Sequence, residues 1–286
     1  MLKHNFEFEA LGTHWQVETI VQLSSDVIRL IKARIESFDK TYSRFRKDSL
    51  IYQISQQAGI YVFPEDGKVL FDFYKKLYET TSGKVTPLIG NALERAGYDA
   101  DYTFQVKPQE AIPAWNEVLE WNGTSLKVKQ PVMLDFGAAG KGYLIDIIGQ
   151  FLVQNNIRDF VVDGSGDLMQ RGIIDNTVGL EHPLRPGEII GAIEVINQSL
   201  CASATNRRVW GNGLHHIFDP DSLKPTDQII ATWVIATDTI TADGLATALF
   251  FTEPRVLANH YSFEYLRMHA GGAIDYSSIF EGQLYS

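Results

Sequence analysis

The feature that most constrains this chain is the stretch over residues 134–146, Leu-Asp-Phe-Gly-Ala-Ala-Gly-Lys-Gly-Tyr-Leu-Ile-Asp. The apolar residues 132–134 predict a strand that ends at Asp135, and the apolar run from Tyr143 onward predicts a helix. Small residues join the two, and several are glycines, which permit positive φ angles and let a ligand approach the backbone closely. The stretch therefore predicts a strand, a tight turn and a helix start.

A turn of this kind has two interpretations. The free N–H groups at a helix start can bind an anion, and Lys141 would add a full positive charge. The alternative is a tight connection between strand and helix that carries a solvated lysine. The pattern is neither G-x-G-x-x-G nor G-x-x-x-x-G-K-[ST], the two common nucleotide-binding motifs. The stretch alone leaves both interpretations open.

The composition limits the function classes. With 286 residues, 45% of them hydrophobic, the chain can bury a large core. Its net charge of −10 argues against a general binder of nucleic acid or anionic membranes, since both favour a basic face. The single Cys201 excludes an intrachain disulfide and a cysteine metal cage. No membrane span is expected, and the N-terminal residues show no signal core or lipidation cysteine, so we expect a cytoplasmic protein.

Helix and strand patterns mix along the chain without strict βαβ alternation, which predicts an α+β protein. No linker, repeat or low-complexity run divides it, so we expect a single domain over 1–286. Strands are predicted over 6–9, 14–21, 159–162, 177–180, 189–196 and 229–236, and at 209. Helices are predicted after Ser24 or Ser25, over 69–81, after the central turn and over 241–250, and short elements over 99–130.

Two pairs of residues are candidates for chemistry. Asp243 and Thr247 stand four apart in a predicted helix and so share one face, where their oxygens suit Mg²⁺ or Ca²⁺. The alternative is that Asp243 interacts with the helix dipole near the N-terminus and that Thr247 bonds back to a carbonyl. His215 and His216 are adjacent in a predicted strand, so at most one of them faces a site.

The loop over 41–49 carries two aromatic residues among polar ones. It is either a surface loop that ends in a helix cap at Asp48 or Ser49, or a loop whose aromatic side chain stacks on a planar ligand.

Taken together, these segments resemble the motifs of the FAD:protein FMN transferase (ApbE) family. The central stretch resembles its signature D-x-G-G-I-A-K-G-Y-x-x-D, and six further segments resemble family motifs in the family's order, over nearly the whole chain. They are 11–13 for M-G-T, 43–49 for S-T-Y-x-x-D-S, 165–167 for G-G-D, 178–183 for V-G-I-x-x-P, 216–220 for H-I-I-D-P and 243–247 for D-A-x-x-T.

The resemblance implies an Mg²⁺-dependent enzyme that moves FMN from FAD onto a threonine or serine hydroxyl of a separate acceptor protein and releases AMP. It implies catalytic roles for His216, Lys141 and Asp243, with His216 handling the proton of the acceptor hydroxyl. It also implies that Asp243 and Thr247 bind the metal together with the backbone carbonyl of Gly140, where the family usually has alanine.

For the flavin nucleotide, the resemblance implies that Lys141 meets the pyrophosphate and that Phe45, in place of the family's tyrosine, lies against the isoalloxazine. The other residues implied to bind the cofactor are Gly137, Asp146, Gly166, Asp167 and Asp219.

The chain also departs from the family pattern in regions expected near the flavin or the acceptor. The family's F-D-P-T is 85–88 here (Val-Thr-Pro-Leu), its S-G is Ala204-Thr205, and Leu223 replaces a loop glycine. An FAD-binding protein without transfer, and an FAD pyrophosphatase that yields FMN and AMP, therefore stay open as alternatives. The presence of both Asp243 and Thr247 favours the enzyme.

Overall fold

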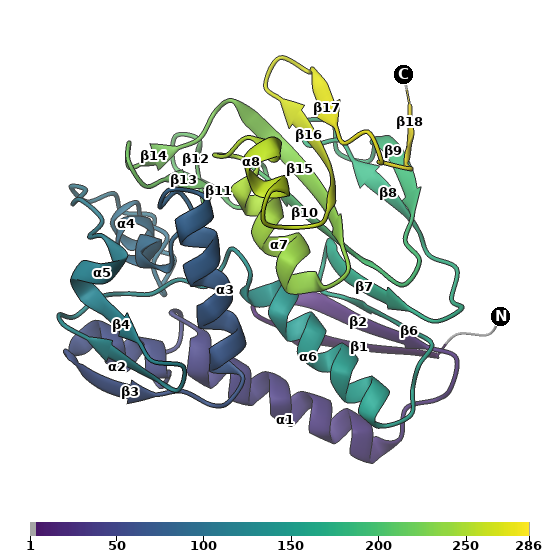
Figure 1. Ribbon diagram of the computed structural model, residues 1–286, viewed down its shortest axis with the longest axis horizontal. Coiled ribbons are helices and arrows are strands. Elements are labelled where there is room, and N and C mark those ends of the chain that lie inside the picture. Colours follow the sequence, from purple (N-terminus) through teal and green to yellow (C-terminus); the bar gives the residue numbers. More distant parts are fainter. Residues whose placement is uncertain (1–3, 286) are drawn as a thin grey trace.

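The computed structural model describes residues 4–285 and is built around a large antiparallel sheet (Figure 1). Its strands follow the order β1-β2-β6-β7-β10-β15-β16-β17, and each neighbouring pair is antiparallel. The bounds are β1 His4–Ala10, β2 Thr13–Thr19, β6 Phe160–Asp163, β7 Asp167–Arg171, β10 Ser199–Ala204, β15 Ile229–Ala236, β16 Glu264–His269 and β17 Ile274–Tyr276.

Four longer helices pack around one side of this sheet: α1 Ser25–Tyr42, α3 Gly67–Thr80, α6 Gly140–Gln154 and α7 Thr239–Ala248. The amphipathic α1 turns Ile31, Ile35 and Phe38 inward, whereas α6 and α7 are buried along most of their length. Helices α6 and α7 contact each other, and α7 lies on β10 and β15.

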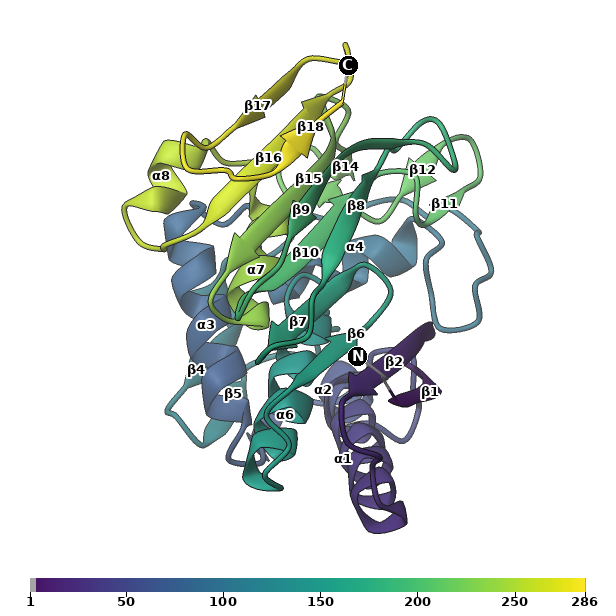
Figure 2. The ribbon, with the colours of Figure 1, turned by 90° about the vertical axis from the view of Figure 1, so that its right-hand side faces the viewer.

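The opposite face of the large sheet carries a second, three-stranded sheet of β8 Thr177–Glu181, β9 Ile189–Glu194 and β18 Gln283–Leu284, which lies in front of it in Figure 2. Strand β15 is therefore covered on both faces. Trp233 and Ile235 pack with the β8–β9 side, while Val234 and Ala236 pack with α7. A strand covered in this way has to be apolar throughout, as β15 is.

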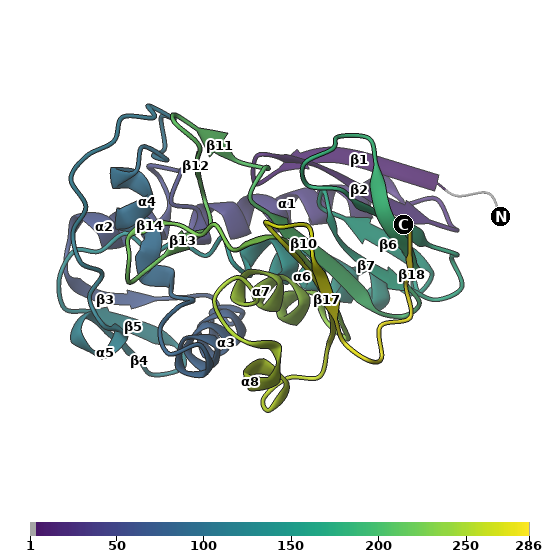
Figure 3. The same cartoon turned by 90° about the horizontal axis from the view of Figure 1, so that it is seen from above.

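A smaller region lies at the other end of the molecule, away from β1 and β2 (Figures 1 and 3). It contains a three-stranded sheet of β3 Gly59–Val62, β5 Ser125–Val128 and β4 Leu119–Trp121. Around it stand α2 Leu50–Gln56, η1 Pro87–Ile89, α4 Gly90–Arg95 and α5 Trp115–Val118. The remaining elements are the hairpins β11 Val209–Trp210 with β12 Leu214–His215 and β13 Phe218–Asp219 with β14 Lys224–Pro225, and α8 Pro254–Ala258.

The α+β class is confirmed, as are the two N-terminal strands, which pair as a hairpin, and the helix capped by Ser24, whose side chain accepts a hydrogen bond from the Val27 N–H. The strand predicted over 132–134 is wrong. That segment pairs with no strand; the Val132 N–H donates to the carbonyl of Ile54, and the Asp135 N–H to that of Pro87. An apolar run next to a turn looks the same in sequence whether a strand or loops supply its hydrogen bonds. No helix within residues 4–285 is both long and apolar enough to cross a membrane.

Helices α6 and α7 cross at very close range, and Gly142 makes this possible. A Cβ atom at position 142 would lie 2.3 Å from the carbonyl oxygen of Thr239 and 2.7 Å from Cβ of Asp243. The Gly142 N–H donates to Oδ2 of Asp243 at 2.8 Å. Asp243 therefore sits in the middle of α7 against the first turn of α6, and the helix is capped instead by Asp238. The alternative that placed Asp243 at the N-terminal dipole is wrong.

A second contact fixes the same pair of helices. The buried carboxylate of Asp146, on α6, accepts hydrogen bonds from the N–H groups of Thr239 and Ile240 at 2.8 Å each. These groups belong to the first turn of α7, where helical N–H groups have no partner within the helix. Burial raises the pKa of Asp146 to about 6 in spite of these bonds. The sequence 140–146 therefore supplies both the start of α6 and the anchor of α7.

We expect Gly142→Ala to lower the free energy of unfolding by about 1–3 kcal/mol, because the added methyl group collides with the backbone of α7. The matched control is Gly140→Ala, where the Cβ would meet only Cβ of Phe136 at an ordinary 3.5 Å. That variant should be as stable as the parent or slightly more stable, since alanine favours helices. Urea unfolding of both variants checks this; equal stabilities would contradict the close crossing.

Asp146 should make stability depend on pH. Folding raises the pKa of Asp146 from 3.8 to about 6. The stabilisation of the folded state by the protonated carboxyl is therefore complete below pH 3.8, and it is lost as the pH rises through 6. Relative to Asp146→Asn, which cannot ionise, the wild type should lose about 2 kcal/mol of unfolding free energy between pH 4.5 and 7. Denaturant titrations of both proteins across this range measure the difference. Parallel pH profiles would rule out the raised pKa.

Candidate active site

A cavity of about 410 Å³ opens where the large sheet meets the smaller region. Its wall is formed by the end of α1 and the loop after it, by residues 84–89, by the turn into α6, by residues 203–218 and by the end of α7. Six residues that the family resemblance implicated line it: Phe45, Gly137, Gly140, Lys141, His216 and Thr247. Segments that are far apart in sequence therefore meet at one place.

The oxygens implied to bind a metal lie at the α6–α7 crossing. Thr247 and Gly140 line the cavity, and Asp243 lies one turn before Thr247, where burial and the nearby Asp167 raise the pKa of its carboxyl well above the usual value. Within the described residues, no group of three or more His, Cys, Asp or Glu side chains is arranged to hold a metal. One carboxylate, one hydroxyl and one carbonyl fit Mg²⁺, which commonly binds one or two carboxylates and completes its shell with substrate phosphates and water.

Lys141 is held by the protein. Its ammonium group lies 2.9 Å from Oδ2 of Asp167 and donates to the carbonyls of Gly164 at 2.9 Å and Ser165 at 3.4 Å. The other oxygen of Asp167 accepts from the Ala202 N–H at 3.1 Å. Lys141 therefore ties the turn between β6 and β7 to the start of α6, while part of its side chain still faces the cavity.

The side chains of the two histidines lie in different surroundings. His215 is buried; its Nδ1 accepts from the Ile217 N–H at 3.3 Å, so its Nε2 carries the proton and donates to the carbonyl of Thr226 at 2.9 Å. His216 lines the cavity, and its buried Nδ1 has no hydrogen-bond partner among residues 4–285. Burial, together with the nearby Arg208, His215 and Lys141, lowers the pKa of His216 to about 3. Its imidazole is therefore neutral at physiological pH.

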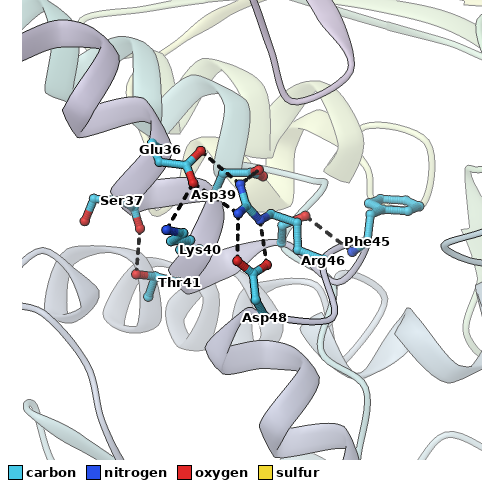
Figure 4. A network of polar contacts seen from close by, with 9 residues as sticks. Glu36, Ser37, Asp39, Lys40, Thr41, Phe45, Arg46 and Asp48 are labelled. Atoms are coloured by element: carbon cyan, nitrogen blue, oxygen red, sulfur yellow. Dashed lines mark hydrogen bonds and ion pairs between the residues drawn. The ribbon is translucent and has the colours of Figure 1, made fainter. Parts of the chain in front are cut away.

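Arg46 fixes the loop that presents Phe45 (Figure 4). Its guanidinium donates to Glu36 and Asp39 on α1 and to Asp48 across the loop, at 2.8–3.0 Å. In Figure 4 the Phe45 ring points away from this cluster. At the cavity, the ring packs against the guanidinium of Arg44, 4.0 Å from its centroid, and against the nearly parallel ring of Tyr102, at 5.8 Å.

Besides Asp243, four of the implicated residues do not line the cavity. Asp146 binds α7, and Asp167 binds Lys141. Gly166 stands in the turn after β6, where its N–H donates to Asp163 at 3.3 Å. Asp219 accepts from Lys84, which does line the cavity, at 2.6 Å.

Three further cavity residues, Arg44, Lys84 and Arg208, belong to none of the site residues implied by the sequence. Arg44 is buried; its Nε donates to Asp135 and its Nη1 to the carbonyl of Tyr98 at 2.8 Å. Partners 91 and 54 residues away leave no local pattern that could have identified this role.

The departures from the family pattern have local structural roles. The Thr86 hydroxyl accepts from the Leu88 N–H and caps η1. Leu223, where the family has glycine, adopts a φ of 54°. That is a left-handed conformation which glycine adopts at lower cost, so the leucine occupies a backbone position that suits glycine.

Comparison with known proteins agrees with the resemblance found in the sequence motifs. Residues 11–265 match the model of the ApbE family. An FAD:protein FMN transferase of Klebsiella pneumoniae (strain 342) is 33% identical over 150 residues, which is 50% of this chain but only 45% of the relative. A second one from the same strain is 22% identical over 86% of this chain and 77% of its own length, and one from Haemophilus influenzae is 24% identical over 85% and 78%.

Solved structures show the same fold. The ApbE protein of Thermotoga maritima superposes with a TM-score of 0.86 at 22% identity, covering 98% of both chains. The flavin transferase ApbE of Vibrio cholerae gives a TM-score of 0.78 at 18% identity, covering 96% of both. Because the family model spans most of the sequence and the whole fold corresponds, this chain belongs to the ApbE family.

Proposed function

We propose that this protein is an FAD:protein FMN transferase, which moves FMN from FAD to a threonine or serine hydroxyl of a separate acceptor protein. The observation that carries the proposal is the meeting of Gly140, Lys141, His216 and Thr247 at one cavity, in a chain whose relatives bear that name. Those names favour transfer to a protein over simple hydrolysis of FAD.

In this reaction the hydroxyl oxygen of the acceptor attacks the flavin-side phosphorus. The bond from that phosphorus to the bridging oxygen breaks, and AMP leaves with the electron pair. We assign His216, whose imidazole is neutral in the free protein, to accept the hydroxyl proton. Mg²⁺ held by Asp243, Thr247 and the Gly140 carbonyl would neutralise charge on the phosphate oxygens.

Phe45 and the turn into α6 complete the proposed site. We assign the flavin ring to the aromatic wall at Phe45 and the pyrophosphate to the turn at residues 137–141. Lys141 shapes this turn through its bonds to the 164–167 segment and contributes positive charge. Asp167 holds Lys141 directly, whereas Asp146 anchors α7, Gly166 closes the turn after β6 and Asp219 binds Lys84.

The first test is incubation with FAD and Mg²⁺, with and without a candidate acceptor, following AMP release and the mass of the acceptor. We expect Asp243→Asn to lower AMP release by roughly 100-fold or more, because the metal loses its carboxylate. Asparagine keeps an oxygen for the Gly142 N–H, so the fold should persist. The control is Asp238→Asn at the cap of the same helix, where asparagine caps equally well. Unchanged turnover in Asp243→Asn would remove the metal assignment.

His216→Ala should slow transfer to the acceptor by roughly 10²–10⁴-fold while FAD binding changes little. His215→Ala loses two hydrogen bonds and should cost about 1–3 kcal/mol of stability, but the folded protein should still transfer FMN. Single-turnover rates, FAD affinities and thermal unfolding of the pair separate the two effects. If His215→Ala were the variant that lost transfer, the roles assigned to the two histidines would be reversed.

A further inference from the structure

The positive charges around the cavity are of two kinds. Among the described residues, five cationic side chains line it, and four of them are bound by carboxylates of the protein. The bound pairs are Arg44 with Asp135, Arg46 with Glu36, Asp39 and Asp48, Lys84 with Asp219 and Asp221, and Lys141 with Asp167. These four cations hold loops in place, and most of their charge is already neutralised.

The fifth, Arg208, is different. Its side chain is half-buried, and within residues 4–285 it forms no hydrogen bond or ion pair with another residue. It stands directly before β11, on the same wall of the cavity as His216. Its charge adds to the effect of burial in lowering the pKa of His216 and partly offsets the burial that raises the pKa of Asp243. A guanidinium that is partly desolvated and unpaired, beside the candidate metal ligands, lacks its anionic partner.

We propose that Arg208 binds the pyrophosphate of the substrate, a role that rests on the proposed function. The guanidinium fork donates two parallel hydrogen bonds to phosphate oxygens, which a lysine cannot do. As the bond from the flavin-side phosphorus to the bridging oxygen breaks, negative charge moves onto the departing AMP phosphate, and Arg208 stabilises it. Lys141, by contrast, keeps its bond to Asp167 and shapes the turn.

The neighbour Arg207 provides a matched control. It carries the same side chain one residue earlier, but it is exposed, pairs with Glu181 and does not line the cavity. Arg207→Ala therefore removes the same charge from the protein as Arg208→Ala without touching the site. Arg208→Lys keeps the charge and removes the fork.

The test measures the affinity of each protein for FAD and for riboflavin, which carries no phosphate, by flavin fluorescence in the presence of Mg²⁺. Arg208→Ala should bind FAD about 10- to 100-fold more weakly, or about 1.4–2.8 kcal/mol, and riboflavin as the wild type does. Arg208→Lys should lie between the two, and Arg207→Ala should match the wild type.

Two results would overturn the assignment. Unchanged FAD affinity in Arg208→Ala would show that the guanidinium does not meet the phosphates. An equal loss for FAD and riboflavin would show that Arg208 only supports the cavity wall. If the wild type itself binds no FAD, the proposed function fails first, and the assignment of Arg208 fails with it.

Discussion

The close crossing of α6 and α7 is the contact on which the rest of the site depends. It exists because residue 142 has no side chain, and it brings the Asp243 carboxylate within 2.8 Å of the Gly142 N–H. One turn later in α6 and one turn earlier in α7, Asp146 binds the first turn of α7. These two contacts set the position of α7 along α6. Thr247 and Gly140 reach the same cavity wall only because that position is fixed.

Most of the cationic side chains at the cavity serve to hold its walls in place. Arg44, Arg46, Lys84 and Lys141 each connect segments distant in sequence or brace a loop. The buried pair of Arg44 and Asp135 is the most demanding, because removing either partner would leave an uncompensated charge in the interior. An acidic protein can therefore hold an anionic substrate in a cavity rich in cations, provided that some cation is left unpaired.

The side chains around Phe45 restrict how a planar ligand can bind there. Phe45 already has the guanidinium of Arg44 over its ring and the half-exposed Tyr102 nearly parallel to it. A planar ring that stacks on Phe45 has to fit beside these two side chains or displace one of them. Tyr102 and Phe104 both have positive φ angles, so this loop holds two large side chains in a conformation that costs energy outside glycine.

The sequence by itself determined the family, the α+β class and most helices, because motif order and apolar periodicity are local properties that survive in one dimension. It also indicated the cavity residues Gly140, Lys141, His216 and Thr247, since the resemblance names each by position. The tertiary structure alone decided that residues 132–134 form no strand, that Asp243 lies mid-helix, and that Asp146 holds α7 rather than lining the cavity. It also decided which cations are neutralised, because ion pairs such as Arg44 with Asp135 join residues 91 apart. Such pairing depends on where the chain returns in space, and no local pattern carries that information.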